Sequence, residues 1–230
     1  MEATLLESVP FRVDVPQLYR RLRLEQGSDD AKEVGRLVEQ AEALAKPKAY
    51  YRPAYVEERD EGWVVIDGVR FASRVLRVNL EGAHRVFPYV ATCGVELEEW
   101  SERLDDLVQR YWASVINEMA LRVAFQTLET HLAEAYRLGK AARMNPGSLA
   151  DWPISQQRPL FDLLGNVTEV TGIRLTDSFL MLPIKSVSGL WFPIEASFES
   201  CQLCPREVCP GRRAAYDAGL FARRYKASGA

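Results

Sequence analysis

The sequence is poor in the residues that most often carry catalysis or bind metals, with two histidines and four cysteines among its 230 residues. It also lacks a long apolar run, because no stretch approaches the ~20 residues that a membrane span requires. Basic and acidic residues number 29 and 32, so there is no excess of positive charge of the kind that binds nucleic acid. The first residues, MEATLLESVPFRVD, include two early glutamates and no basic segment, unlike a secretory signal. We therefore expect a cytoplasmic protein that interacts with neither membranes nor nucleic acid.

The chain is, in contrast, rich enough in apolar residues, at 47%, to form one sizeable core with a small appended lobe. Residues 48–93 and 171–194 have the alternation and turn residues of short strands, and Asp67-Gly68 is a strong hairpin signal. Apolar residues that recur every three or four positions predict three helices, with Gly139 placed to end the second. These helices span residues 30–46, 96–138 and 155–164.

The order of these elements is strands, a long helix and strands again, which is not the regular βαβ alternation of a parallel sheet. We predict an α+β fold in residues 1–195, with a mainly antiparallel twisted sheet packed with long central helices. Residues 196–230 are predicted to form a Cys-rich metal-binding tail that ends in a short basic helix.

Three of the four cysteines are gathered in the segment SFESCQLCPREVCPGRRAAYD, residues 197–217. Cys201, Cys204 and Cys209 follow the pattern C-x2-C-x4-C, and clustered thiols in a reducing compartment are more often metal ligands than disulfides. With Cys93 as the fourth ligand they would hold an iron–sulfur cluster of the 4Fe–4S type. Zinc with a fourth ligand from Cys93, a histidine or a carboxylate is the alternative metal. No bound metal is the third possibility, and Cys93, if it is not a ligand, is interpreted as a small buried core residue.

The cysteines are accompanied by Arg206, Arg212 and Arg213. Cations near a negatively charged cluster would raise its reduction potential. They would also attract an acidic electron donor such as a flavodoxin or ferredoxin.

A separate group of motifs lies in residues 141–195, with the sequence RMNPGSLADWP, then LFDLL, then TGIRLTDSFLMLPIKSVSGLWF. In order and spacing these pieces resemble the C-terminal activation domain of cobalamin-dependent methionine synthase. That domain carries an Arg-x-x-x-Gly-Tyr loop, a TG-x-x-LT-[DE]-SF-x-M-x-P stretch and an SVSG turn followed by aromatic residues. The matching residues here are Arg143, Gly147, Thr171, Gly172, Leu175, Thr176, Ser178, Phe179, Met181, Pro183, Ser186, Val187, Ser188 and Gly189.

The resemblance implies a protein that binds S-adenosylmethionine and presents its methyl group to an oxidised cobalamin. The chain has no Asp-x-His-x-x-Gly motif for cobalamin, so the resemblance implies that the cobalamin is carried by a partner. That partner would be a corrinoid-binding protein or a cobalamin-dependent methyltransferase.

The resemblance also implies a set of cofactor-binding residues. Arg143 would hold the ligand carboxylate, Gly147 would let the backbone approach, and Glu129 would face the sulfonium or the ammonium. The hydroxyls of Ser186 and Ser188 would donate to ribose or amide groups. The remaining members of this set are Pro146, Ser148 and Gly189. Ser148 stands where the family has tyrosine, a loss of aromatic area and of a phenol hydroxyl.

Each of these residues also has a purely structural interpretation. Arg143 would then be a surface cation, Gly147 a turn residue and Glu129 a solvated carboxylate, while the two serines would cap strands.

At the level of the whole protein, the sequence predicts reductive activation of a separate corrinoid protein, with an iron–sulfur cluster supplying or relaying the electron. One alternative is a non-catalytic module that binds a corrinoid protein and holds structural zinc or no metal. Another is a methyltransferase that uses the same scaffold directly.

Overall fold

The computed structural model describes residues 2–7, 9–195, 197–209 and 211–226. Its centre is an eight-stranded sheet in which every strand pair is antiparallel. The strands are β1 (Thr4–Leu6), β2 (Lys48–Tyr51), β3 (Ala54–Arg59), β4 (Trp63–Ile66), β5 (Val69–Ala72), β6 (Arg85–Thr92), β7 (Ala141–Met144) and β10 (Ser186–Pro193). A separate two-stranded hairpin contains β8 (Arg174–Leu175) and β9 (Met181–Leu182).

The longest strand pairing joins β6 to β10. β2 and β3 pair with one edge of β6, whereas β10 pairs with it from Ser186 opposite Thr92 to Trp191 opposite Phe87. β7 then pairs with the far edge of β10. The predicted hairpin joins β4 to β5, and its residues Asp67 and Gly68 have φ values of 42° and 76°. Positive φ at both central positions is typical of the two-residue turn that such a dipeptide favours.

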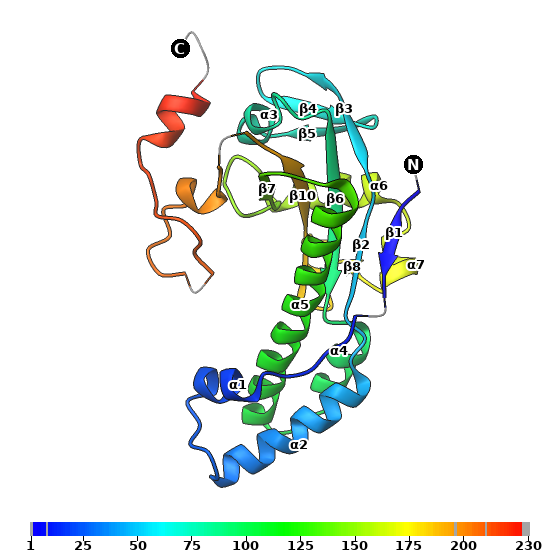
Figure 1. Cartoon of the computed structure of the whole chain (residues 1–230), viewed down its shortest axis with the longest axis vertical. Coiled ribbons are helices and arrows are strands. Elements are labelled where there is room, and N and C mark those ends of the chain that lie inside the picture. Colours follow the sequence, from blue (N-terminus) through cyan, green and yellow to red (C-terminus); the bar gives the residue numbers. More distant parts are fainter. Residues whose placement is uncertain (1, 8, 196, 210, 227–230) are drawn as a thin grey trace.

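The helices are arranged around one long helix. They are α1 (Val15–Leu22), α2 (Asp29–Leu44), α3 (Arg74–Asn79), α4 (Val95–Glu102), α5 (Leu107–Tyr136), α6 (Gln157–Leu164) and α7 (Val167–Thr171). The second half of α5 packs on the sheet at β2 and β6, while its first half extends beyond the sheet to meet α1, α2 and α4 (Figure 1). The opposite face of the sheet is covered by α3, α6 and α7.

The predicted helix over 96–138 is wrong in one respect, because the chain breaks it into α4 and α5. Asp106 ends the break by accepting hydrogen bonds from the backbone N–H groups of Val108 and Gln109, at 2.8 and 2.9 Å. A side-chain oxygen at this position satisfies donors that a helix start leaves unpaired. At the other end the cap is Arg137, in the left-handed conformation, and not Gly139.

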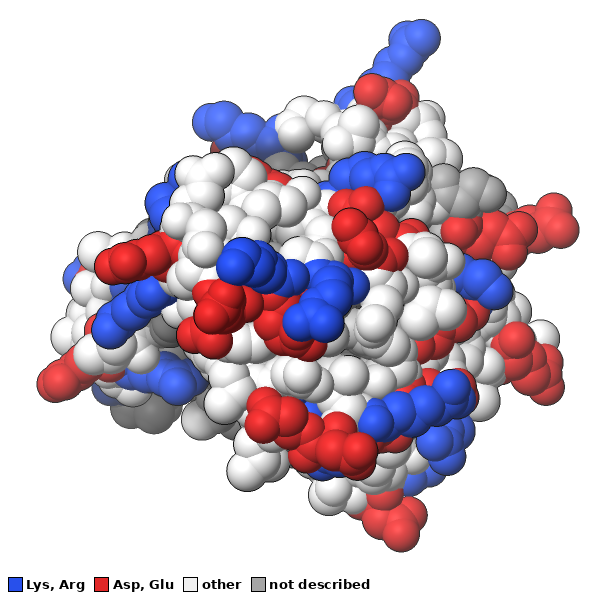
Figure 2. Space-filling model, turned by 90° about the horizontal axis from the view of Figure 1, so that it is seen from below, with Lys and Arg blue, Asp and Glu red and all other residues white. Residues whose placement is uncertain are grey.

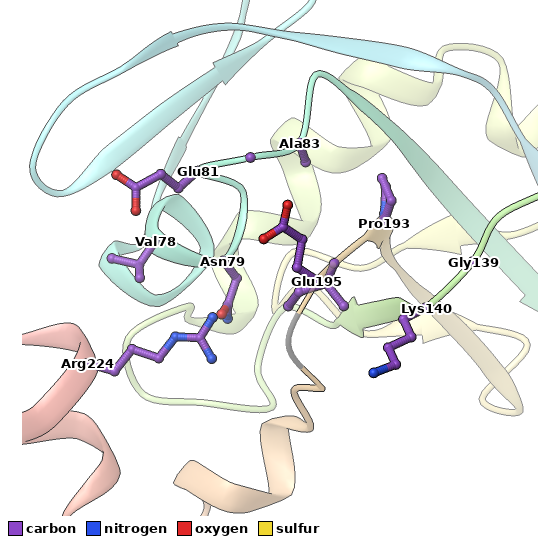
Figure 3. A pocket seen from close by; sticks show the side chains of 11 residues that line it. Val78, Asn79, Glu81, Ala83, Gly139, Lys140, Pro193, Glu195 and Arg224 are labelled. Carbon is purple, nitrogen blue, oxygen red and sulfur yellow. The ribbon is translucent and has the colours of Figure 1, made fainter.

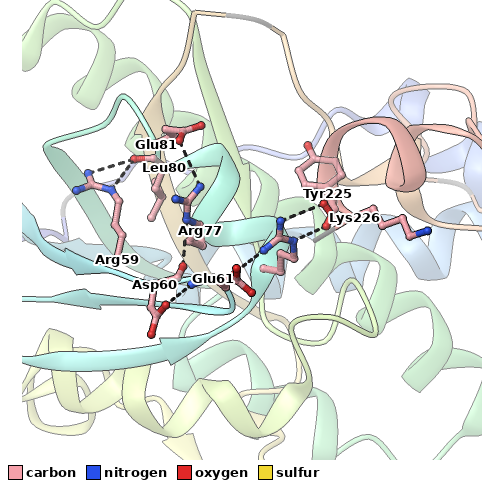
Figure 4. A network of polar contacts seen from close by, with 9 residues as sticks. Arg59, Asp60, Glu61, Arg77, Leu80, Glu81, Tyr225 and Lys226 are labelled. Carbon is pink, nitrogen blue, oxygen red and sulfur yellow. Dashed lines mark hydrogen bonds and ion pairs between the residues drawn. The ribbon is translucent and has the colours of Figure 1, made fainter. Parts of the chain in front are cut away.

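The segment after β10 returns to the body of the protein. Tyr225 is fully buried and its hydroxyl donates to Asn79 Oδ1 at 2.9 Å, while its ring meets that of Phe198 edge-on. The guanidinium of Arg74 donates to the carbonyl oxygens of Tyr225 and Lys226 (Figure 4). The predicted basic helix is reduced to one helical turn, Phe221–Tyr225.

These observations confirm the predicted fold class, a mixed α+β domain with an antiparallel sheet and long central helices. The proposed division between residues 195 and 196 stays a prediction, and Ala196 lies outside the described residues. Among the helices that the structure describes, none combines the length and the apolar character needed to cross a bilayer. On the face formed by the helical end, basic and acidic side chains are interspersed (Figure 2).

Candidate functional site

The loop that follows β7 is held in one shape by its own residues. Gly147 has φ 83°, and its N–H donates to the carbonyl oxygen of Trp152 at 2.7 Å. A Cβ at position 147 would lie 2.8 Å from Ile154 Cδ1, and the positive φ further favours glycine. The side chain of Trp152 is fully buried against Phe71, which anchors the loop to the core. Gly147 therefore serves the turn, as its structural interpretation predicted, and also lies exposed on the surface of the site.

The strand β10 passes close to this loop at Gly189. A Cβ there would lie 2.5 Å from the carbonyl oxygen of Met144 and 2.8 Å from the Tyr89 hydroxyl. The side chain of Asn145 lies where a Cβ at position 189 would point. Its Nδ2 donates to the carbonyl oxygen of Ser188 at 2.7 Å and to the Tyr89 hydroxyl at 2.8 Å. Gly189 is thus required for the close approach of β7, β10 and β6.

Two adjoining pockets lie along this strand, and they share Asn145 and Val187 as lining residues. We call the two together the β10 groove. The first pocket, of about 580 Å³, is lined by Pro146, Gly147, Ser148, Ser186 and Ser188 among others. The second, of about 510 Å³, is lined by Glu129 and Arg143 among others. The structure therefore brings seven of the eight predicted cofactor-binding residues to one groove, and Gly189 lies in the strand beneath it.

Arg143 and Glu129 form an ion pair within the second pocket. The guanidinium of Arg143 also lies over the rings of Phe125, at 4.6 Å, and Trp191, at 5.6 Å. Such contacts hold a planar guanidinium in place, because the cation is attracted to the π face of each ring. A guanidinium held in this way loses little further freedom when it binds a ligand. Arg143 is therefore held inside the site and is not a freely solvated surface cation.

The two serine hydroxyls are already engaged within the protein. Ser188 Oγ donates to Gln157 Oε1 at 2.8 Å, and Ser186 Oγ lies 2.9 Å from Thr92 Oγ1 and 2.8 Å from the carbonyl oxygen of Pro183. Gln157 in turn donates to the carbonyl oxygen of Phe179 at 3.0 Å. These contacts favour the structural interpretation of the hydroxyls, which fix the walls of the first pocket.

Sequence reasoning missed several residues of the groove, among them the polar residues Tyr89, Asn145 and Gln157. Asn145 lies inside the recognised motif and was detectable as its central polar residue, whereas Tyr89 and Gln157 carry no local signal. Burial raises the pKa of Tyr89 to about 12, and the charge of Arg143 and the hydrogen bond from Asn145 act in the opposite direction. The phenol at the base of the groove is therefore neutral at ordinary pH and serves as a hydrogen-bonding group.

The four cysteines are not gathered into one site. Cys93 is fully buried among helices α2, α4 and α5, whereas Cys204 packs against the core on the other side of the sheet. Among the described residues, which include all four cysteines, there is no group of three or more His, Cys, Asp or Glu side chains placed to hold a metal ion. The residues present do not fit a tetrahedral zinc site or an iron–sulfur cluster with Cys93 as fourth ligand, because the end of β6 and the tail lie in different parts of the molecule (Figure 1). The alternative interpretation of Cys93 as a buried core residue agrees with its place.

A third cavity, of about 590 Å³, lies away from the β10 groove, between α3, the ends of β7 and β10, and the tail. Glu195 and Lys140 flank it, and Arg224 reaches toward it from the last helical turn (Figure 3). None of the predicted site residues lines this cavity.

Comparisons with known proteins bear on the family and on the fold. Residues 91–200, just under half of the chain, match the family described as the activation domain of vitamin B12 dependent methionine synthase. The solved structure titled "Crystal Structure of the MetH Reactivation Domain bound to AdoHcy" is 14% identical to this chain, with a TM-score of 0.60. The similarity covers 86% of this chain and 81% of that one. A comparison with curated protein sequences gives no match. The resemblance predicted from residues 141–195 is thereby confirmed, and the solved structure supports the fold.

Proposed function

We propose that this chain binds S-adenosylmethionine in the β10 groove and supports the reductive activation of a corrinoid carried by a separate protein. Two observations support the proposal beyond the family match. The groove consists of two adjoining pockets, and the second pocket contains the opposite charges of Arg143 and Glu129. The similar reactivation domain is titled as bound to AdoHcy, the demethylated form of the same ligand.

The Arg143–Glu129 pair is the observation on which the proposal depends. An α-amino acid carries a carboxylate and an ammonium on one carbon, so a guanidinium and a carboxylate side by side can contact both ends. Arg143 would donate to the ligand carboxylate from N–H groups beyond the one that meets Glu129, and Glu129 would accept from the ammonium. The nucleoside would then lie in the first pocket, beside Gly147 and Ser148.

In this class of reaction S-adenosylmethionine would supply a methyl cation and leave as S-adenosylhomocysteine, and the partner's corrinoid, reduced by one electron from Co(II), would supply the acceptor. The protein's own residues would bind and orient the ligand and present it at the open side of the groove. Leu180 and Ile184 line the first pocket and are exposed, at 59% and 69%, so they offer apolar area to a corrinoid protein.

An electron relay through a cluster on Cys201, Cys204 and Cys209 is not part of the proposal, because the thiols and carboxylates of the described chain do not form the required ligand set. The electron would come instead from a separate donor of the flavodoxin or ferredoxin type. Arg206, which is exposed on the tail, is a candidate contact for such an acidic protein.

The first test is calorimetric titration of the protein with S-adenosylmethionine. We expect Arg143→Ala to weaken binding by about tenfold to a hundredfold, the usual cost of losing a hydrogen bond to a charged group. Arg103→Ala is the matched control, since Arg103 is also paired with a glutamate but lies exposed on α4's C-terminal side, away from the groove. Equal affinities of the wild-type protein and Arg143→Ala would remove Arg143 from the site.

The second test measures activation directly. A cobalamin-dependent methionine synthase that lacks its own activation domain, held in the Co(II) state, would be mixed with this chain, S-adenosylmethionine and a reductant. The proposal predicts that the Co(II) absorbance decays only when all components are present. Binding of the ligand without any such decay would favour the methyltransferase alternative.

A further inference from the structure

The tail contributes to the β10 groove through residues beyond position 200, where the family match ends. Gly211, Arg212 and Arg213 line the second pocket together with Arg143 and with residues of α5. The charge of Arg213 also acts on the buried hydroxyl of Tyr89, at the base of the same pocket, in the direction that lowers its pKa. Residues more than a hundred positions from Tyr89 in sequence therefore line the same pocket as Tyr89.

The tail changes the charge of this pocket. Outside the tail, the charged residues that line this pocket are two glutamates and two arginines, so their charges cancel. They are Glu118, Glu129, Arg122 and Arg143. Arg212 and Arg213 add two positive charges, and both come from the tail. A pocket with this excess favours a ligand group that carries negative charge.

The two tail arginines have different roles. The guanidinium of Arg212 donates to the carbonyl oxygens of Cys201, at 3.2 Å, and Ala214, at 3.3 Å, so it shapes the tail itself. Arg213 donates from Nε to Glu199 Oε2 at 2.7 Å, and Glu199 is not among the residues that line the pocket. The side chains of Arg213 and Glu199 are 35% and 39% exposed, and an ion pair in such a position contributes little to stability. Arg213 can therefore exchange this partner for a ligand at small cost.

We propose that Arg213 is a ligand-binding residue that contacts the carboxylate of the S-adenosyl ligand from the tail side, opposite Arg143. The inference rests on the proposed function and deepens it. Arg143 already pairs with Glu129, so only part of its guanidinium can donate to a ligand. A second guanidinium would complete the recognition of a carboxylate, for which arginine is the best matched side chain. The tail then selects ligands that have an amino-acid arm over plain nucleosides.

The test uses two ligands that differ in this arm. S-Adenosylhomocysteine has the carboxylate, whereas 5′-methylthioadenosine keeps the nucleoside and the sulfur but lacks the amino-acid group. Calorimetric titrations of the full chain should show that Arg213→Ala binds S-adenosylhomocysteine about tenfold more weakly than wild type. The two proteins should bind 5′-methylthioadenosine equally. Arg206→Ala removes the same charge from an exposed position of the same tail and should leave both affinities unchanged.

The variant Arg213→Lys keeps the charge without the fork geometry and should fall between wild type and Arg213→Ala. Equal affinity of wild type and Arg213→Ala for S-adenosylhomocysteine would overturn the inference alone. An equal loss for both ligands would also overturn it, because Arg213 would then act on the nucleoside or on the shape of the pocket. A wild-type protein that binds no S-adenosylhomocysteine would overturn the proposed function and the inference with it.

Discussion

At the scale of single residues, the site depends on side chains fixed by contacts that come from elsewhere in the chain. Arg143 is held by Glu129 and two aromatic rings of other elements, and Asn145 joins β7 to β6 and β10. Side chains positioned in this way lose little conformational freedom when a ligand binds. The groove is therefore preformed at its charged end.

The buried thiol of Cys93 should differ in reactivity from the three thiols of the tail, which are partly exposed. Burial, with a further contribution from the charge of Glu98, raises the pKa of Cys93 to about 12. The thiolate is the reactive form, so at pH 8 Cys93 should resist iodoacetamide in the native protein and react only after unfolding. The tail cysteines, which are partly exposed, should react in the native protein.

Mass spectrometry of the alkylated peptides would measure this difference, with a urea-unfolded sample as the control. Rapid labelling of Cys93 in the native protein would contradict its placement. Protection of Cys201, Cys204 and Cys209 that disappears on treatment with a chelator would show that a metal binds to the tail.

At the scale of elements, β10 is the strand on which the groove depends, since it pairs with both β6 and β7. Gly189 allows this because no side chain fits between Met144, Asn145 and Tyr89. We expect Gly189→Ala to lower the free energy of unfolding by about 1–3 kcal/mol, the usual cost of overpacking a closed site. It should also weaken ligand binding, because Asn145 must move.

Gly139→Ala is the matched control for this prediction. Gly139 is exposed, and no atom lies within 4 Å of the position that an added methyl group would take, so the substitution should change stability little. Urea unfolding of both variants gives the comparison. If the midpoints of Gly189→Ala and wild type coincide, the close approach of the three strands is wrong.

Local signals in the sequence were sufficient for much of the fold. Asp67-Gly68 predicted its hairpin because the conformation of a two-residue turn depends on those two residues alone. The order of strands and helices excluded a parallel sheet, and the motif that contains Arg143 and Gly147 predicted the loop of the site.

Features that depend on distant packing were not predictable in the same way. The break before α5 was missed because apolar residues, Leu104 and Leu107, continue the helical pattern across it, although Asp106 caps a new helix there. The predicted four-cysteine metal site was wrong because the spacing of cysteines along the chain does not determine where Cys93 is buried. In the structure it packs among the helices, away from the tail. Gln157 belongs to the groove because α6 packs on β5 and β6 and brings its first residue within hydrogen-bonding distance of Ser188, which no local pattern indicated.

At the scale of the whole molecule, the proposed function predicts that a corrinoid protein docks at the open side of the groove. Under the proposed function, Ile184→Asp should weaken association with a cobalamin-loaded methionine synthase that lacks its own activation domain, since the charge must be desolvated at the contact. Leu107→Asp is the matched control, because Leu107 is similarly exposed, at 78%, but begins α5 at the helical end of the molecule.

Calorimetry or analytical ultracentrifugation of the mixed proteins would measure the two affinities. We expect a loss of about tenfold or more for Ile184→Asp and no change for Leu107→Asp. Equal affinities of the two variants would place the docking surface elsewhere.

The pairing of β10 with β6 also has a consequence for how the protein is made. The residues that pair in these strands are separated by about a hundred positions, so one edge of β6 stays open during synthesis until residue 193 has emerged from the ribosome. An unpaired apolar edge of this kind invites association with other nascent chains. Translation pauses or chaperones that act between α5 and β10 should therefore govern the yield of folded protein more strongly than any event before α5.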